Sequence, residues 1–264
     1  MGRVITVTSG KGGVGKTTAT ANIAAALASQ GQRVVAVDAD IGLRNLDVVL
    51  GLENRIVFDV VDVVEGRCRI RQALIRDKRV PDLFLLPASQ TRDKDALEPH
   101  QMVEVCNQMR EEFDFILVDS PAGIEGGFRV ALAPADQVLI VTTPEVSAVR
   151  DADRVIGLVE AAEKGPALLL LNRVKPSMVR RGDMLGPEDV VEILAVDLVG
   201  MVPEDEAVVV STNRGLPLVL DGRHPAGRAF SNIAARLSGR DVPMNDIEED
   251  RGILARIVRF VRHG

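Results

Sequence analysis

A glycine-rich run near the N-terminus carries the clearest chemical signal in the sequence. Two glycines separated by four residues are followed by Lys16 and Thr17, and an apolar segment precedes them. Glycines let the backbone point its N–H groups at phosphate oxygens, and a helix N-terminus adds partial positive charge. In such a loop the lysine reaches the β- and γ-phosphates, and the threonine hydroxyl binds Mg²⁺. The predicted nucleotide-binding residues here are Gly10, Lys11, Gly12, Gly13, Val14, Gly15, Lys16, Thr17 and Thr18.

A dinucleotide-binding site is the competing interpretation of the same run. Gly10, Gly12 and Gly15 also fit the dinucleotide fingerprint, and Asp38 stands where a ribose-binding acid belongs. A nicotinamide site has no use for the lysine and threonine that end the motif, whereas a triphosphate with Mg²⁺ needs both. The pattern therefore favours a nucleoside triphosphate.

Acidic and amide side chains follow the apolar runs farther along the chain. Asp38, Asp40 and Asp119 each come at or just after the end of such a run, and Asn172 ends another. In open α/β sheets, ligands bind at the carboxyl ends of the strands. A single aspartate there is commonly a turn or capping residue, but three beside a phosphate loop predict Mg²⁺ ligands, mostly through water, or groups that position an attacking water. Asn172 is either a contact to an adenine edge or a simple turn residue.

Short apolar runs alternate with helix-length segments and must position these side chains. Because the runs are rich in Val, Ile and Leu with little polar alternation, they predict strands buried on both faces. We expect an α/β fold with a mainly parallel, doubly wound sheet and helices on both faces. The predicted strands are 4–8, 33–38, 83–87, 115–119, 137–142, 167–172 and 198–202. The predicted helices are 17–30, 99–112, 147–164, 187–196 and 225–237.

Composition and charge exclude some classes of protein. The chain has 264 residues, a net charge of −6, seven Phe, no Trp and no Tyr. Scarce aromatic residues and an acidic balance argue against base stacking on nucleic acid. Cys68 and Cys106 are too few for a disulfide scaffold or a four-thiolate metal site, so we expect reduced, partly buried thiols.

The last 14 residues differ in character from the rest. We expect a nucleotide-binding domain over 1–238, a linker over 239–250 and a basic amphipathic tail over 251–264. On a helix the apolar residues share one side and the arginines the other, the pattern of a helix in the interface of an anionic membrane. A helix that docks on its own domain or on a partner is the alternative. The predicted membrane residues are Ile253, Leu254, Arg256, Ile257, Arg259, Phe260, Val261 and Arg262.

The phosphate loop also carries a family resemblance. Its run Lys-Gly-Gly-Val-Gly-Lys-Thr-Thr, which begins at Lys11, resembles the deviant Walker A motif of the MinD/ParA-type ATPases. That resemblance implies that Lys11 reaches the partner's nucleotide across an ATP-dependent homodimer. It also implies that Asp119 belongs to the Walker B segment and that Asp38 and Asp40 belong to switch I. Asp40 is then the candidate for orienting the hydrolytic water, although the sequence leaves the roles of these two aspartates open. The implied adenine contacts are Asn172, Pro203, Glu204 and Asp205.

Further segments resemble the MinD branch of this family. They span residues 40–47, 87–97, 144–154 and 181–185. The resemblance implies contacts with a MinC-like inhibitor and a MinE-like activator, with Arg44, Asp151 and Asp153 as candidate partner residues. For the two aspartates, compensation of the dipole at a helix N-terminus is the alternative.

Together these observations predict a membrane-cycling ATPase. We expect catalysis by Lys11, Lys16 and Asp40, with ATP and Mg²⁺ as cofactors and Thr17, Asp38 and Asp119 at the metal. Intrinsic activity would be weak and stimulated by partner and membrane, and the protein would move between cytoplasm and membrane surface to place the division site. A ParA-like DNA-segregation ATPase and a nucleotide-gated scaffold for flagellar placement are the alternatives.

Overall fold

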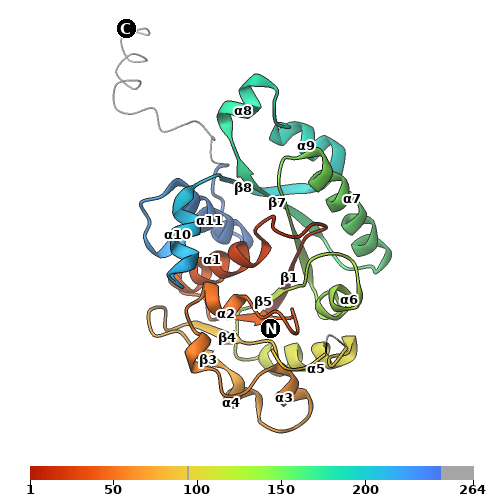
Figure 1. Cartoon of the computed structure of the whole chain (residues 1–264), viewed down its shortest axis with the longest axis vertical. Helices are drawn as coiled ribbons and strands as arrows, with labels where there is room; N and C mark the ends of the chain where they lie inside the picture. Colours follow the sequence, from red (N-terminus) through yellow and green to blue (C-terminus); the bar gives the residue numbers. More distant parts are fainter. Residues whose placement is uncertain (94, 245–264) are drawn as a thin grey trace.

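A twisted, mainly parallel β-sheet forms the centre of the molecule in the computed structural model (Figure 1). The structure describes residues 1–93 and 95–244. Within these residues the sheet has eight strands in the order β3-β4-β2-β5-β1-β6-β7-β8, and only the edge pair β3–β4 is antiparallel. The strands are β1 (Arg3–Thr8), β2 (Val34–Asp38), β3 (Ile75–Arg76), β4 (Leu83–Leu86), β5 (Phe115–Asp119), β6 (Gln137–Thr142), β7 (Ala167–Val174) and β8 (Asp197–Pro203).

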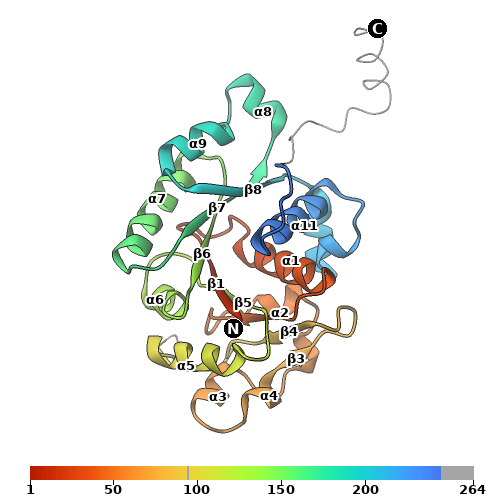
Figure 2. The ribbon, with the colours of Figure 1, turned by 180° about the vertical axis from the view of Figure 1, so that it is seen from behind.

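Helices cover both faces of this sheet, as Figures 1 and 2 show from opposite sides. The helices α1 and α11 pack together on one face, while α5, α6 and α7 lie on the other. The longer helices are α1 (Lys16–Ser29), α5 (Pro99–Met109), α6 (Gly126–Leu132), α7 (Val146–Ala161), α9 (Pro187–Leu194), α10 (Glu206–Asn213) and α11 (Pro225–Leu237). The short ones are α2 (Leu46–Val49), α3 (Val60–Val64), α4 (Ile70–Ala73) and α8 (Pro176–Arg181), with 3₁₀ turns at Glu53–Arg55 and Leu218–Leu220.

The expected fold class is confirmed, and the errors are confined to short elements. All seven predicted strands and all five predicted helices are present, with ends within three residues of those expected. Sequence analysis missed β3, which is two residues long, and the helices of eight residues or fewer other than α9. Such helices are marginal alone and depend on tertiary packing or caps, such as the Asp59 carboxylate that accepts from the first turn of α3.

The chain leaves the sheet domain after α11. The Arg236 guanidinium donates to the carbonyls of Val199 on β8 and of Val242, so the first residues of the predicted linker 239–250 pack on the domain. The rest of that linker and the predicted tail 251–264 lie outside the described residues, and the proposed domain boundaries stay predictions. In the part of the chain that the structure describes, no helix is long and apolar enough to cross a bilayer.

Candidate nucleotide site

The phosphate loop connects β1 to α1 at the carboxyl edge of the sheet. Gly15 caps α1 with a φ of 95°, a left-handed conformation that favours glycine. A Cβ at Gly15 would lie 2.3 Å from the Asn172 amide nitrogen, and that nitrogen donates to the Val14 carbonyl at 2.7 Å. Gly10 approaches the Asp151 carbonyl so closely that a Cβ would lie 2.2 Å from its oxygen. These close contacts, one with the Asn172 side chain and one with the Asp151 backbone, therefore fix the loop between β7 and α7.

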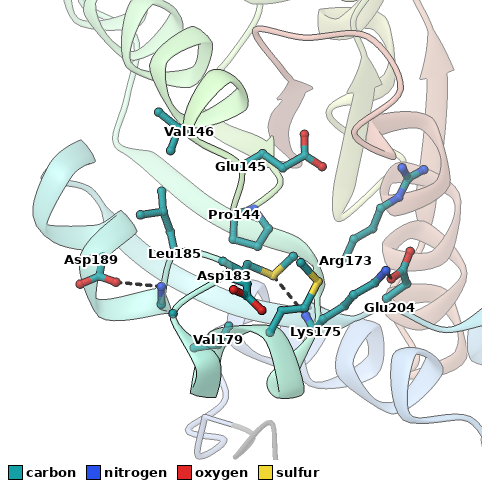
Figure 3. Close-up of a pocket in the computed structure, with 14 residues that line it drawn as sticks. Pro144, Glu145, Val146, Arg173, Lys175, Val179, Asp183, Leu185, Asp189 and Glu204 are labelled. Atoms are coloured by element: carbon teal, nitrogen blue, oxygen red, sulfur yellow. Dashed lines mark hydrogen bonds and ion pairs between the residues drawn. The ribbon is translucent and has the colours of Figure 1, made fainter.

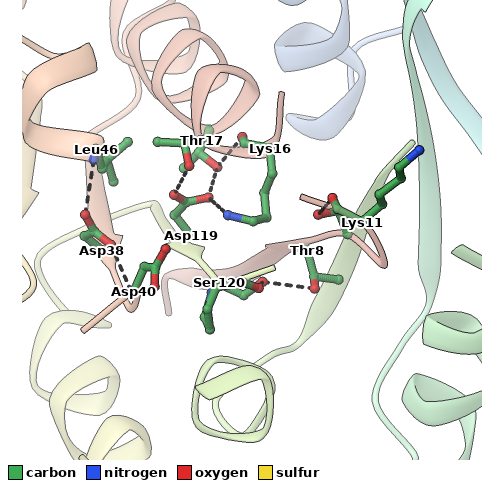
Figure 4. Close-up of polar contacts among 12 residues, drawn as sticks. Thr8, Lys11, Lys16, Thr17, Asp38, Asp40, Leu46, Asp119 and Ser120 are labelled. Atoms are coloured by element: carbon green, nitrogen blue, oxygen red, sulfur yellow. Dashed lines mark hydrogen bonds and ion pairs between the residues drawn. The ribbon is translucent and has the colours of Figure 1, made fainter. Parts of the chain in front are cut away.

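Asp119, the last residue of β5, lies at the centre of the site (Figure 4). Its carboxylate accepts from the Lys16 ammonium at 3.1 Å, the Thr17 hydroxyl at 2.7 Å and the Thr20 hydroxyl at 3.0 Å. The side chains of Lys16 and Asp119 are only 8% and 2% exposed. The structure thus brings together a lysine, a hydroxyl and a carboxylate that the sequence predicted to share one site. Thr20 was missed, although it lies four residues after Lys16, on the same helix face.

The carboxylates of Asp38 and Asp119 end neighbouring strands. Asp38 pairs in register with Asp119, and it accepts from the backbone N–H groups of Asp40 at 2.9 Å and Leu46 at 3.1 Å. Burial, followed by the negative charge of Asp119, raises the pKa of Asp38 to about 7. Asp40 is half-buried beside it. The segment that follows β2 is therefore tied to the sheet by the Asp38 carboxylate.

Lys11 extends away from this buried cluster (Figure 4). Its ammonium donates to the Ser147 hydroxyl at 3.1 Å and lies 3.7 Å from the Glu145 carboxylate, both at the start of α7. The Lys11 side chain is 42% exposed. A role in a partner's site stays a prediction, and it would require these contacts to be exchanged for others.

A cavity of about 680 Å³ opens beside the phosphate loop. It brings the predicted adenine contacts together with Gly15 and Thr18, although they come from three separate segments. Asp205 also caps α10 by accepting from the Ala207 N–H at 2.9 Å. The predicted residues that line the cavity are Gly15, Thr18, Asn172, Pro203, Glu204 and Asp205, and those not predicted include Arg173, Lys175, Glu206, Val208, Val209 and Phe230. The latter group carried no local sequence signal, because its members meet only in the folded chain.

A second hollow of about 640 Å³ adjoins the first and shares Arg173, Lys175 and Glu204 with it. Figure 3 shows Glu145 and Val146 at the start of α7 on one side and Leu185 on the other. The Lys175 ammonium pairs with the Glu204 carboxylate at 2.5 Å. This pair therefore stands at the boundary between the two hollows.

Comparison with known proteins identifies the family. A family model described as the CobQ/CobB/MinD/ParA nucleotide binding domain matches residues 5–218. The chain belongs to this family. It is 53% identical, over 260 residues, to the septum site-determining protein MinD of Synechocystis sp., covering 98% of each chain. These findings place it in the MinD branch of the MinD/ParA family.

Solved structures of the MinD/ParA family agree. A chain of the MinC:MinD cell division protein complex of Aquifex aeolicus matches with a TM-score of 0.88 and 51% identity, covering 94% of this chain and 100% of that one. The septum site-determining protein MinD of Pyrococcus horikoshii, complexed with Mg-ADP, matches with a TM-score of 0.80 and 31% identity over 90% and 96% of the two chains. As a MinD/ParA-type protein the chain binds a nucleotide at the phosphate loop, and the dinucleotide interpretation is set aside.

The oxygen atoms around Asp119 suit a hard divalent cation. The Thr17 hydroxyl and the Asp38 and Asp119 carboxylates are the ligand types that Mg²⁺ prefers. Among residues 1–93 and 95–244, no group of three or more His, Cys, Asp or Glu side chains could hold a metal ion by itself. At such a site phosphate oxygens and water would complete the coordination of Mg²⁺.

The three candidate partner residues belong to two different segments of the chain. Arg44 has a φ of 44° and pairs with the buried Asp47 carboxylate at 2.8 Å. Asp151 and Asp153 lie in the first half of α7, where Asp153 is exposed and the Asp151 carboxylate is 4.0 Å from Arg154. Their contact with partners stays a prediction.

Proposed function

We propose that this protein is an ATP hydrolase that dimerises on ATP, attaches reversibly to the inner face of the cell membrane and places the division site. The observation that carries the proposal is the cluster of Lys16, Thr17 and Asp119 at the sheet edge. The near full-length likeness to septum site-determining proteins supports the biological role.

Phosphoryl transfer needs positioning and charge stabilisation more than a strong base. Lys16 would hold the β- and γ-phosphates, and the loop N–H groups would cradle their oxygens. Mg²⁺, held by Thr17 with Asp38 and Asp119 through water, would supply positive charge to the phosphate oxygens. Asp40, beside Asp38, would orient the attacking water.

Dimerisation is proposed to depend on Lys11. Its ammonium is exposed at the rim of the site, and its contacts with Ser147 and Glu145 at the start of α7 are of a kind that solvent-exposed groups exchange easily. In a dimer it would reach the partner's nucleotide, so that ATP binding and association become one event. Hydrolysis would then return the protein to single subunits.

Membrane attachment is proposed to come from the tail 251–264. Residues 251–264 hold four Arg and no acid, so subtracting +4 from the total of −6 leaves −10 on the other 250 residues. A basic helix on an acidic body suits binding to anionic lipid through the tail alone. Because one short helix binds weakly, two tails in one dimer would bind far better through effective concentration.

The proposed partners are a MinC-like division inhibitor and a MinE-like activator. The Aquifex aeolicus relative was solved as a complex with MinC, and this chain matches it over 94% of its length. We propose Arg44, Asp151 and Asp153 as contact residues for such partners.

Sedimentation with vesicles of equal parts phosphatidylcholine and phosphatidylglycerol tests the proposal on the full chain. We expect pelleting with ATP and Mg²⁺, and little with ADP, after deletion of 251–264 or in Lys11→Ala. Lys78→Ala removes another exposed lysine and should pellet like the wild type. Equal pelleting with ATP, with ADP and in Lys11→Ala would refute the nucleotide-gated mechanism. ATP-dependent binding to DNA that survives tail deletion would support the DNA-segregation alternative instead.

A further inference from the structure

Arg79 joins three segments that are far apart in the sequence. It lies in the connection between β3 and β4, and its guanidinium donates to the Gly215 carbonyl at 2.7 Å and to the Leu50 carbonyl. The same guanidinium donates hydrogen bonds to both carboxylate oxygens of Asp77, at 3.1 Å and 2.6 Å. Asp77 is 1% exposed, so the guanidinium is held in one orientation by a buried carboxylate.

The two carbonyls belong to segments that touch directly. Gly51 and Gly215 both have positive φ, of 63° and 60°, and a Cβ on Gly51 would lie 2.5 Å from the Gly215 carbonyl oxygen. Figure 1 shows α2 between α10 and the β3–β4 pair, and α2 contacts α10. This close packing of the two backbones places the Leu50 and Gly215 carbonyls within reach of one guanidinium.

Each segment leads to a different part of the nucleotide site. Leu50 ends α2, whose first N–H, that of Leu46, donates to the Asp38 carboxylate at 3.1 Å. Gly215 follows α10, whose residues Glu206, Val208 and Val209 line the cavity beside the phosphate loop. Arg79 therefore lies on a path from that cavity to Asp38, between the ends of α10 and α2.

We propose that Arg79 is a positioning residue, because its guanidinium bridges the ends of α10 and α2. Through this bridge, a nucleotide base bound in the cavity beside the phosphate loop, called the base cavity below, restrains α2 and the Leu46 N–H that binds Asp38. A base bound against α10 restricts the motion of that helix. The hydrogen bonds of Arg79 then restrict the motion of α2 as well. The inference rests on the nucleotide site and not on membrane attachment, so a failure of vesicle binding leaves it standing.

Backbone hydrogen exchange with two ligands tests this coupling. Saturating Mg-ADP fills both the phosphate loop and the base cavity, whereas Mg-pyrophosphate fills the loop alone, and exchange at residues 10–18 reports binding of each. In the wild type we expect ADP to slow exchange at residues 46–51 at least tenfold more than pyrophosphate does. A substitution that only perturbs the local structure would alter exchange equally with ADP and with pyrophosphate. It would therefore leave the difference between the two ligands unchanged.

Arg79→Lys is the test variant, because lysine keeps the charge beside Asp77 but offers a point donor instead of a planar fork. We expect the difference between ADP and pyrophosphate at residues 46–51 to vanish, while ADP still slows exchange at residues 206–213. Arg76→Ala is the matched control, since Arg76 lies in the same hairpin and its guanidinium donates to the Pro81 carbonyl. A tenfold difference that persists in Arg79→Lys, or one that is absent from the wild type, overturns the proposal.

Discussion

At the scale of single residues, the site depends on one buried carboxylate that serves several donors. Asp119 accepts from Lys16, Thr17 and Thr20, and its negative charge adds to the effect of burial in raising the pKa of the neighbouring Asp38. A buried ion pair contributes little net stability, but removal of one partner leaves a buried charge without compensation.

We therefore expect Asp119→Asn to lower the free energy of unfolding by about 3 kcal/mol in the absence of nucleotide. The Lys16 ammonium would stay buried and lose its carboxylate. Urea unfolding followed by circular dichroism measures the change. Asp197→Asn, at an exposed position at the start of β8, should leave the unfolding free energy almost unchanged, and an equal loss in both variants would contradict the argument.

The two cysteines should differ sharply in reactivity. Both thiols are free, and Cys106 is buried whereas Cys68 is half-buried. Burial raises the pKa of Cys106 to about 12, and it raises the pKa of Cys68 less strongly. Because the thiolate is the nucleophile, a raised pKa lowers reactivity at a given pH. At pH 8 we expect a maleimide to label Cys68 slowly and Cys106 only after unfolding, as peptide mass spectrometry can show. Labelling of Cys106 in the folded Cys68→Ser variant would contradict this expectation.

At the scale of elements, loops at the carboxyl ends of the strands carry the chemistry and the helices hold them in place. In α7, Gly157 has nothing within 4 Å of the place where a Cβ would stand, but in α6 a Cβ on Gly127 would lie 2.7 Å from the Pro121 ring.

These two glycines make a matched pair. We expect Gly157→Ala to stabilise the protein by about 0.5–1 kcal/mol, because alanine has the higher helix propensity and the site is open. Gly127→Ala should destabilise it, because the added methyl would push against Pro121 in the segment after Asp119. Chemical denaturation of both variants tests the signs, and loss of stability in Gly157→Ala would show that the face of α7 is not open.

At the scale of the whole molecule, the average charge conceals two parts of opposite sign. The negative charge of residues 1–250 argues against binding to nucleic acid. It does not argue against binding to an anionic membrane, because the tail 251–264 is basic.

Vesicle binding should therefore depend on lipid charge and salt. Replacement of Arg256, Arg259 and Arg262 by Gln should weaken ATP-dependent pelleting with anionic vesicles at least tenfold, whereas thermal unfolding of the domain should not change. Pelleting of the wild type should fall as salt screens the arginines. Equal binding to vesicles of pure phosphatidylcholine would contradict this electrostatic contribution.

The sequence by itself determined the features that are encoded in contiguous residues. The phosphate loop, the aspartates at the ends of β2 and β5 and the mainly parallel sheet all follow from local pattern, because glycine spacing and runs of apolar residues act over a few positions. The tertiary structure decided which side chains and carbonyls are in direct contact. Lys16 and Asp119 are 103 residues apart and Arg79 and Gly215 are 136 apart, yet both pairs form hydrogen bonds. Such contacts depend on the order of strands in the sheet and on the packing of short helices that are unstable alone, and no local pattern specifies either.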